Sequence, residues 1–122
     1  PLTTSECIAH YKSSTFVFLP TLLEVFSATY LEAMSMGVPI VTSDRMFARD
    51  ICHDAAVYVD PCNVHDISNK IHRLITTPAE FRRCVVVGRE LFSKHPTPQE
   101  KIKIIYRMFQ SVTIKSDNPE IT

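Results

Sequence analysis

The chain has 122 residues, of which 45% are hydrophobic and 21% charged, a composition typical of one packed globular domain and not of a disordered segment. Thirteen basic and thirteen acidic side chains cancel, so no positive surplus points to nucleic acid as a partner. The sequence has no apolar run long enough to span a membrane and no signal-peptide pattern.

The first predicted element is a helix that ends at about Lys12. Thr3 and Glu6 form a capping-box pattern at its start, and Tyr11 is expected to face inward. Residues 16–19 (FVFL) then form a continuous apolar run, which predicts a strand covered on both faces. Pro20 ends this strand because it has no N–H for a ladder.

A second helix and a second strand follow. Ser27 or Thr29 can cap the helix, and Gly37 is placed to end it in the left-handed conformation. Residues 39–42 (PIVT) re-enter the sheet. Two parallel strands joined by a helix make a βαβ unit.

The rest of the chain adds one strand and four helices. A short helix over residues 47–52 precedes a strand over 55–59. Capping patterns then predict three longer helices, starting at Asn63, Thr77 and Thr97. Their expected inner stripes are Ile67, Ile71, Leu74 and Ile75 in the first helix, Phe81, Val85, Gly88 and Phe92 in the second, and Ile102, Ile105, Phe109 and Val112 in the third.

This order predicts an α/β fold in three layers, with a short parallel sheet of about three strands flanked by helices. We assign residues 1–113 to the domain and 114–122 to a flexible tail. The strand at Phe16–Leu19 would leave an apolar edge exposed, so we expect the chain to self-associate there.

The βαβ unit contains two carboxylates, Glu24 in the turn after the first strand and Glu32 in the helix. Open α/β sheets hold ligands at the carboxyl ends of their strands, and a helix N-terminus there favours an anion such as phosphate. A carboxylate accepts hydrogen bonds from sugar hydroxyls. The pattern therefore predicts a phosphate at the start of the helix and hydroxyl-bearing groups held by Glu24 and Glu32.

Residues 20–41, PTLLEVFSATYLEAMSMGVPIV, resemble the donor-site signature of retaining GT-B glycosyltransferases of the large group 1 family (glycosyltransferase family 4). The resemblance runs from about Ser5 to Met108 and implies a Rossmann-like half-domain of the GT-B fold. It implies that Glu24 is catalytic and faces the transferring sugar, and that Glu32 binds the ribose. The expected diphosphate contacts are Phe26, Ser27, Ala28 and Thr29.

The resemblance also implies a nucleoside-diphosphate sugar of UDP or GDP type as donor, no required cofactor and no metal. A facing N-terminal acceptor domain is the implied partner, and the isolated piece is expected to be inactive. The family has glycine where Val25 and Ser27 stand, a difference that bears on the sugar and phosphate contacts. A non-catalytic binding or assembly module, or another GT-B enzyme such as a nucleotide-sugar epimerase, remains as the alternative.

The four cysteines bear on metal binding and on location. They show no C-x-x-C spacing, and the sequence has no cluster of histidines, so we predict no zinc site and no disulfide framework. Unpaired thiols favour a reducing compartment, and the expected location is the cytoplasm, with the cytosolic face of a membrane as the variant for a longer protein.

Overall fold

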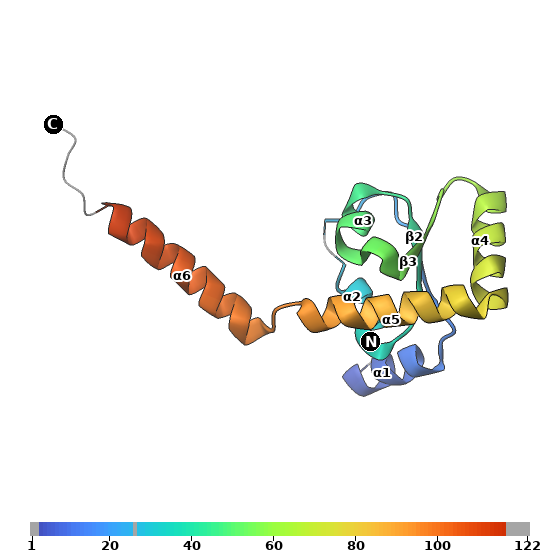
Figure 1. Cartoon of the computed structure of the whole chain (residues 1–122), viewed down its shortest axis with the longest axis horizontal. Helices are drawn as coiled ribbons and strands as arrows, with labels where there is room; N and C mark the ends of the chain where they lie inside the picture. The colour runs from blue at the N-terminus through green and yellow to red at the C-terminus, as the bar shows by residue number, and fades with distance from the viewer. Residues whose placement is uncertain (1–2, 26, 117–122) are drawn as a thin grey trace.

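The computed structural model describes residues 3–25 and 27–116, except for the side chains of residues 111–116. Its elements, in chain order, are α1 (Thr4–Ser13), β1 (Val17–Leu19), α2 (Ala28–Met36), β2 (Ile40–Ser43), α3 (Met46–Cys52), the 3-10 turn η1 (His53–Ala55), β3 (Ala56–Val59), α4 (Val64–Thr76), α5 (Pro78–Lys94) and α6 (Pro98–Ser116). Helices and strands alternate as far as β3, and the helices α4, α5 and α6 then follow one another, as predicted (Figure 1).

The three strands form one parallel sheet in the order β1-β2-β3. Successive residues of β2 point to opposite faces: Ile40 packs in a cluster with α2 and α3, whereas Val41 packs with Leu74 of α4. Helix α5 contributes to both clusters, through Cys84 near its start and Leu91 near its end. The sheet therefore lies between two helical layers, which confirms the predicted three-layer α/β architecture.

Most helix ends follow the predicted local chemistry. Thr3 and Glu6 form a complete capping box at α1, and Thr97 with Glu100 makes the same reciprocal bonds at α6. The side chain of Asn63 accepts from the N–H of Asp66 at α4. Gly37 ends α2 with φ of 70°, a conformation that glycine adopts without a Cβ penalty. These caps fix where the helices begin and end.

Two predicted caps are absent. Ser27 is the N-cap residue of α2, but its side chain makes no capping hydrogen bond, and Thr29 lies inside the helix. Thr77 likewise makes no side-chain cap at α5. The carboxylate of Glu80, which should have completed that box, instead accepts two hydrogen bonds from Arg73 at 2.7 and 2.6 Å. An ion pair with the preceding helix has displaced the cap.

Some residues predicted to be buried are exposed. Phe18 is 43% exposed, so β1 is not covered on both faces as predicted. Ile75 and Phe92 are also exposed, at 52% and 41%. The row of α5 that packs inward comprises Phe81, Cys84, Gly88 and Leu91. The predicted and the observed row both mix steps of three and four residues, so the helical period alone does not choose between them, and the position of the sheet decides which row is buried.

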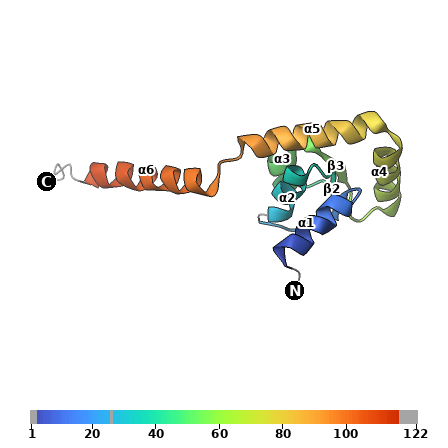
Figure 2. The same cartoon turned by 90° about the horizontal axis from the view of Figure 1, so that it is seen from below.

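Helix α6 extends away from the body in both views (Figures 1 and 2). The inner stripe predicted for it is exposed, with Ile102 at 67% and Ile105 at 52%. Val112 lies outside the described side chains. The helix continues to Ser116, and the division at residue 113 stays a prediction.

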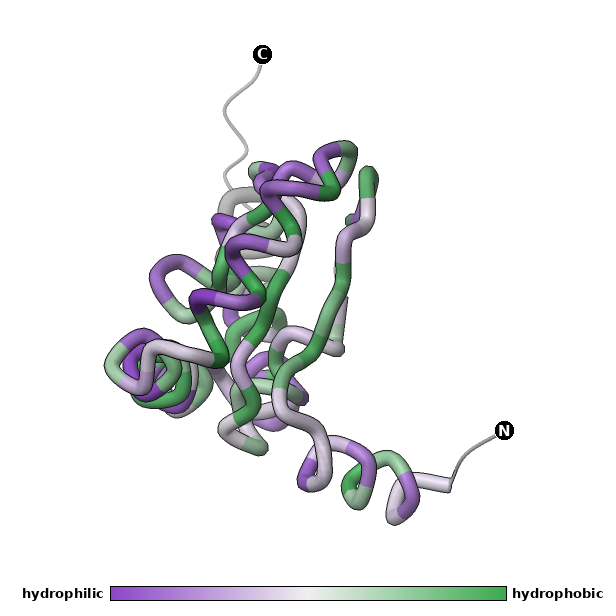
Figure 3. Tube along the Cα trace, turned by 90° about the vertical axis from the view of Figure 1, so that its right-hand side faces the viewer, coloured by the Kyte–Doolittle hydropathy of each residue, from purple (hydrophilic) through white to green (hydrophobic). Residues whose placement is uncertain are grey.

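Strand β1 lies at the end of the sheet order, and the structure places no described strand on its outer side. It is largely hydrophobic (Figure 3). Self-association along this edge stays a prediction. What the fold does establish is that β1 and β2 end side by side, because Leu19 is in register with Thr42.

Candidate functional site

The candidate site lies where β1 and β2 end. The loop of residues 20–27 leads from β1 into α2, and the turn after Ser43 leads from β2 into α3. Because the strands are parallel and in register, both connections leave the same edge of the sheet. The sequence-predicted residues are therefore carried by one loop and by the helix that follows it.

Two consecutive hydrogen bonds of buried hydroxyl groups connect α2 to the ends of β1 and β2. The hydroxyl of Thr42 donates to the carbonyl oxygen of Leu19 at 2.9 Å. Since a hydroxyl has one proton, Thr42 must accept from the Tyr30 hydroxyl, whose oxygen is 2.8 Å away. Tyr30 and Thr42 are both fully buried, and burial raises the pKa of the phenol. This network ties α2 to the ends of both strands.

Two further hydroxyls in these connections are buried without a partner. Thr21 Oγ1 follows β1 and Ser43 Oγ ends β2, and neither forms a hydrogen bond within the described part of the chain. An unsatisfied buried polar atom costs about 1–3 kcal/mol, so such atoms are rare and often belong to functional sites. The sequence prediction missed both residues, although a hydroxyl residue at the end of each strand was a visible signal.

The first turn of α2 offers uncapped backbone donors. Ser27 is 9% exposed and supplies no side-chain cap, so the N–H groups of Ala28 and Thr29 have no acceptor among the described residues. The first turn also contains no acidic side chain. Val25, which stands where the family has glycine, is 93% exposed and so does not fill this region. Phe26, a predicted contact, lies outside the described residues.

Glu24 and Glu32 have separate surroundings. Glu24 is half-buried and makes no hydrogen bond or ion pair within the described residues. Glu32 is exposed, and its Oε2 accepts a hydrogen bond of 2.7 Å from the Tyr11 hydroxyl. The structure thus bonds Glu32 to a tyrosine and gives Glu24 no such contact among the described residues, and the roles of both stay predictions.

The arginines that follow β2 are engaged elsewhere. Arg49 donates to both oxygens of Asp44, at 2.5 and 2.9 Å, and stacks 4.4 Å from the ring centre of Tyr58. This guanidinium lowers the pKa of Asp44 mainly by hydrogen bonding. Arg45 donates weakly, at 3.4 Å, to the carbonyl oxygen of Asp44. We therefore assign no ligand contact to either arginine.

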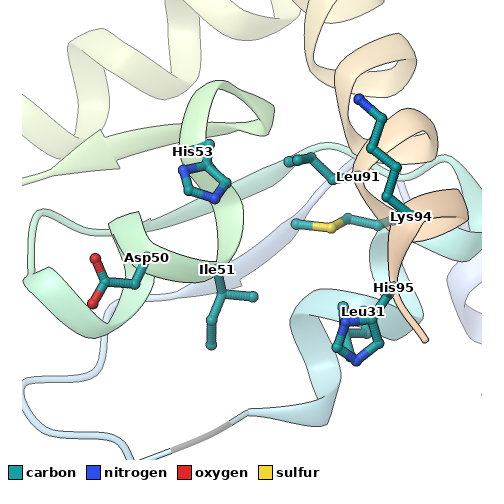
Figure 4. A pocket seen from close by; sticks show the side chains of 8 residues that line it. Leu31, Asp50, Ile51, His53, Leu91, Lys94 and His95 are labelled. Carbon is teal, nitrogen blue, oxygen red and sulfur yellow. The ribbon is translucent and has the colours of Figure 1, made fainter. Parts of the chain in front are cut away.

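Two cavities flank α2. Figure 4 shows one of about 230 Å³ between α2, α3, η1 and the end of α5. Its lining includes Asp50, His53, Lys94 and His95, but no predicted donor-site residue. The other, of about 330 Å³, lies between α1 and α2 and has Glu32 in its wall. Of these two cavities, only the second adjoins a predicted site residue.

The structure also bears on metals and membranes. Within residues 3–25 and 27–116, no three His, Cys, Asp or Glu side chains come together in a way that could hold a metal ion. None of the described helices combines the length and the apolar character needed to cross a bilayer.

Comparison with known proteins decides the family. The sequence profile described as "Glycosyl transferases group 1" matches residues 2–91, about three quarters of the chain. The chain belongs to the group 1 glycosyltransferases. This membership confirms the resemblance found in residues 20–41.

Two curated relatives of this group 1 chain are themselves transferases by name. D-inositol 3-phosphate glycosyltransferase of Thermobifida fusca is 28% identical over 90 residues, which cover 72% of this chain and 21% of the relative. MMP alpha-(1->4)-mannosyltransferase of Mycolicibacterium hassiacum is 32% identical over 99 residues, which cover 75% of this chain and 24% of the relative. The chain therefore spans less than a quarter of the length of either relative.

A solved structure agrees on the fold. Sucrose-phosphate synthase from Thermosynechococcus elongatus superposes with a TM-score of 0.73 and 21% identity, over 84% of this chain and 27% of that chain. At this identity the likeness supports the fold alone. It fits the α/β half-domain of GT-B type that the sequence predicted.

Proposed function

We propose that this group 1 chain is the donor-binding portion of a glycosyltransferase that moves a sugar from a nucleoside-diphosphate sugar to an acceptor hydroxyl with retention of configuration. The observation that carries the proposal is the uncapped N-terminus of α2, where two backbone N–H groups have no acceptor among the described residues. The connections that follow β1 and β2 also hold the buried hydroxyls of Thr21 and Ser43, which have no partner in the described part of the chain. These groups donate hydrogen bonds and suit a diphosphate.

The two glutamates take different parts of the donor. Glu24, half-buried and without a hydrogen-bonding partner in the described structure, would face the transferring sugar, while Glu32 would accept from the ribose hydroxyls. Ser27, Ala28 and Thr29 would meet the diphosphate through the start of α2. The contribution to catalysis is positional and electrostatic: the helix N-terminus stabilises the leaving diphosphate.

The donor is of UDP or GDP type, with protein groups instead of a metal ion holding the diphosphate. The chain spans less than a quarter of its curated relatives, so we expect turnover only together with an acceptor domain. The donor contacts proposed above all lie within this chain, so we expect it to bind the donor by itself. All four cysteines are free, which supports a cytoplasmic location or the cytosolic face of a membrane.

Titration of the ¹⁵N-labelled chain with UDP, GDP and the corresponding nucleoside-diphosphate glucose tests the proposal. Binding should shift the backbone amides of residues 27–29. Glu32→Ala should weaken the binding of nucleotide and nucleotide sugar alike, by about tenfold, the size expected for a hydrogen bond to a charged group. Glu24→Ala should weaken only the nucleotide sugar, because Glu24 faces the sugar.

Glu90→Ala, an exposed glutamate of α5, is the matched control and should bind like the parent chain. The proposal is wrong if neither nucleotide binds at millimolar concentration. It is also wrong if the amide shifts cluster around the cavity of Figure 4, or if the Glu32 and Glu90 variants bind equally well.

A further inference from the structure

The carboxylate of Glu32 is already held from one side. Its Oε2 accepts from the Tyr11 hydroxyl at 2.7 Å, the short distance typical of a hydroxyl bonded to an ionised carboxylate. The two residues lie 21 positions apart, on α1 and α2, so the bond is tertiary and not part of a local turn. No other side-chain hydrogen bond to this carboxylate is formed by the described residues.

Of the two partners, Tyr11 is the fixed one. Its ring is half-buried and packs against the main core cluster, whereas Glu32 is exposed. The last turn of α1, which carries Tyr11, is closed by hydrogen bonds within the helix: Ser14 N–H donates to the carbonyl oxygen of Tyr11 at 3.1 Å, and the Ser13 and Ser14 hydroxyls donate to that of His10. Glu32 has three rotatable side-chain bonds, and the phenol selects one arrangement for it.

We propose that Tyr11 is a positioning residue: its hydroxyl orients the Glu32 carboxylate so that the free oxygen, Oε1, accepts from the ribose hydroxyls of the donor. The inference rests on the proposed function, because it needs Glu32 to meet the ribose. A carboxylate has about four acceptor positions, so one bond from Tyr11 leaves enough for both hydroxyls of a vicinal diol.

The surroundings suit this role. Tyr11 and Glu32 both line the cavity of about 330 Å³ between α1 and α2, which gives a nucleoside room beside the carboxylate. Burial, and then the bond to Glu32, raise the pKa of Tyr11 to about 12. The phenol therefore stays protonated, and stays a donor, at any physiological pH.

A purely structural role is the competing explanation, since the same bond also attaches α1 to α2. The two roles predict different results for Tyr11→Phe, which keeps the packed ring and removes only the hydroxyl. A structural clip would change all ligands equally. A positioning residue would change only those ligands that carry ribose hydroxyls.

The experiment compares whichever of UDP and GDP binds more tightly with its 2′,3′-dideoxy analogue, by calorimetric titration of four chains. The parent chain should prefer the ribonucleotide by about tenfold, and Glu32→Ala should abolish that preference. Tyr11→Phe should reduce the preference to about threefold or less, with unchanged affinity for the dideoxy analogue. Tyr106→Phe, an exposed tyrosine of α6, should behave like the parent.

The outcomes separate the inference from the proposed function. If Glu32→Ala removes the preference but Tyr11→Phe keeps it in full, or weakens both ligands equally, the positioning role of Tyr11 is overturned and the donor site stands. If Glu32→Ala keeps the preference, or no nucleotide binds, the ribose site itself is overturned and the role of Tyr11 with it. Circular dichroism of each variant verifies that the fold is kept.

Discussion

The buried hydroxyl chain from Tyr30 through Thr42 to the carbonyl oxygen of Leu19 allows a quantitative prediction for stability. Tyr30→Phe removes one neutral hydrogen bond and leaves Thr42 donating to Leu19, so it should cost about 1 kcal/mol. Thr42→Val preserves the shape but removes both bonds. It leaves a buried phenol and a buried carbonyl without this partner, and should cost about 3 kcal/mol.

The double variant separates this mechanism from simple loss of packing. With Phe at position 30 no phenol is left unsatisfied, so the pair should cost about 2 kcal/mol, less than the sum of about 4 kcal/mol for the single variants. Urea denaturation measures these differences. With a slope of about 1–2 kcal/mol/M, a change of 2 kcal/mol moves the midpoint by roughly 1–2 M.

Additive costs, within about 0.5 kcal/mol, would contradict the shared network, because residues that do not share a bond behave independently. The control is Tyr106→Phe, which removes the hydroxyl of an exposed tyrosine and should change stability by less than about 0.5 kcal/mol.

Four other predictions follow from particular residues. His53 has φ of 42°, which strains any residue but glycine, so His53→Gly should raise the unfolding free energy by about 1 kcal/mol. The control, His72→Gly within α4, should lower the unfolding free energy. A loss of stability on His53→Gly would contradict the strain. Burial raises the pKa of the Cys52 thiol from 9.0, and that of the Tyr11 phenol from 10.0, each to about 12. The unfolded chain therefore loses these protons at lower pH than the folded chain, and the unfolding free energy measured in urea should fall between pH 9 and pH 12. A rise over this interval would contradict the raised pKa values. Half-buried Cys7 lies in the wall of the cavity beside Glu32, so a bound nucleoside diphosphate should slow its alkylation. The alkylation rate of exposed Cys62 should not change, and mass spectrometry measures both rates. If nucleotide changes neither rate, the ligand binds elsewhere. Self-association along Phe16–Leu19 should be seen by sedimentation, and a monomer at ~100 μM would count against it.

The local elements and the family were determined by the sequence alone. Alternation of apolar runs with capping residues predicted the order of helices and strands, because these signals act over a few residues and depend little on the rest of the fold. Gly37 is the clearest case, since its left-handed backbone can be expected from the glycine and the following proline. The string from residue 20 to residue 41 likewise carried the family resemblance.

Which face of each helix is buried was decided by tertiary packing. Ile75 and Phe92 fit an amphipathic pattern as well as their buried neighbours do, yet they are exposed, because the position of the sheet selects one stripe among several. Glu80 shows the same for caps: its sequence position suits Thr77, but its carboxylate is bonded to Arg73 of the preceding helix, which carries a full charge.

In the candidate site, too, some residues could be found from the sequence and others only from the tertiary structure. Glu24 and Glu32 could be found from sequence because their spacing and neighbours form a motif. The partner of Glu32 could not, since Tyr11 lies on a separate helix and meets the carboxylate only after α1 has packed against α2. That the hydroxyls of Thr21 and Ser43 have no partner among the described residues was equally hidden, because whether a buried polar atom finds a partner depends on every element around it.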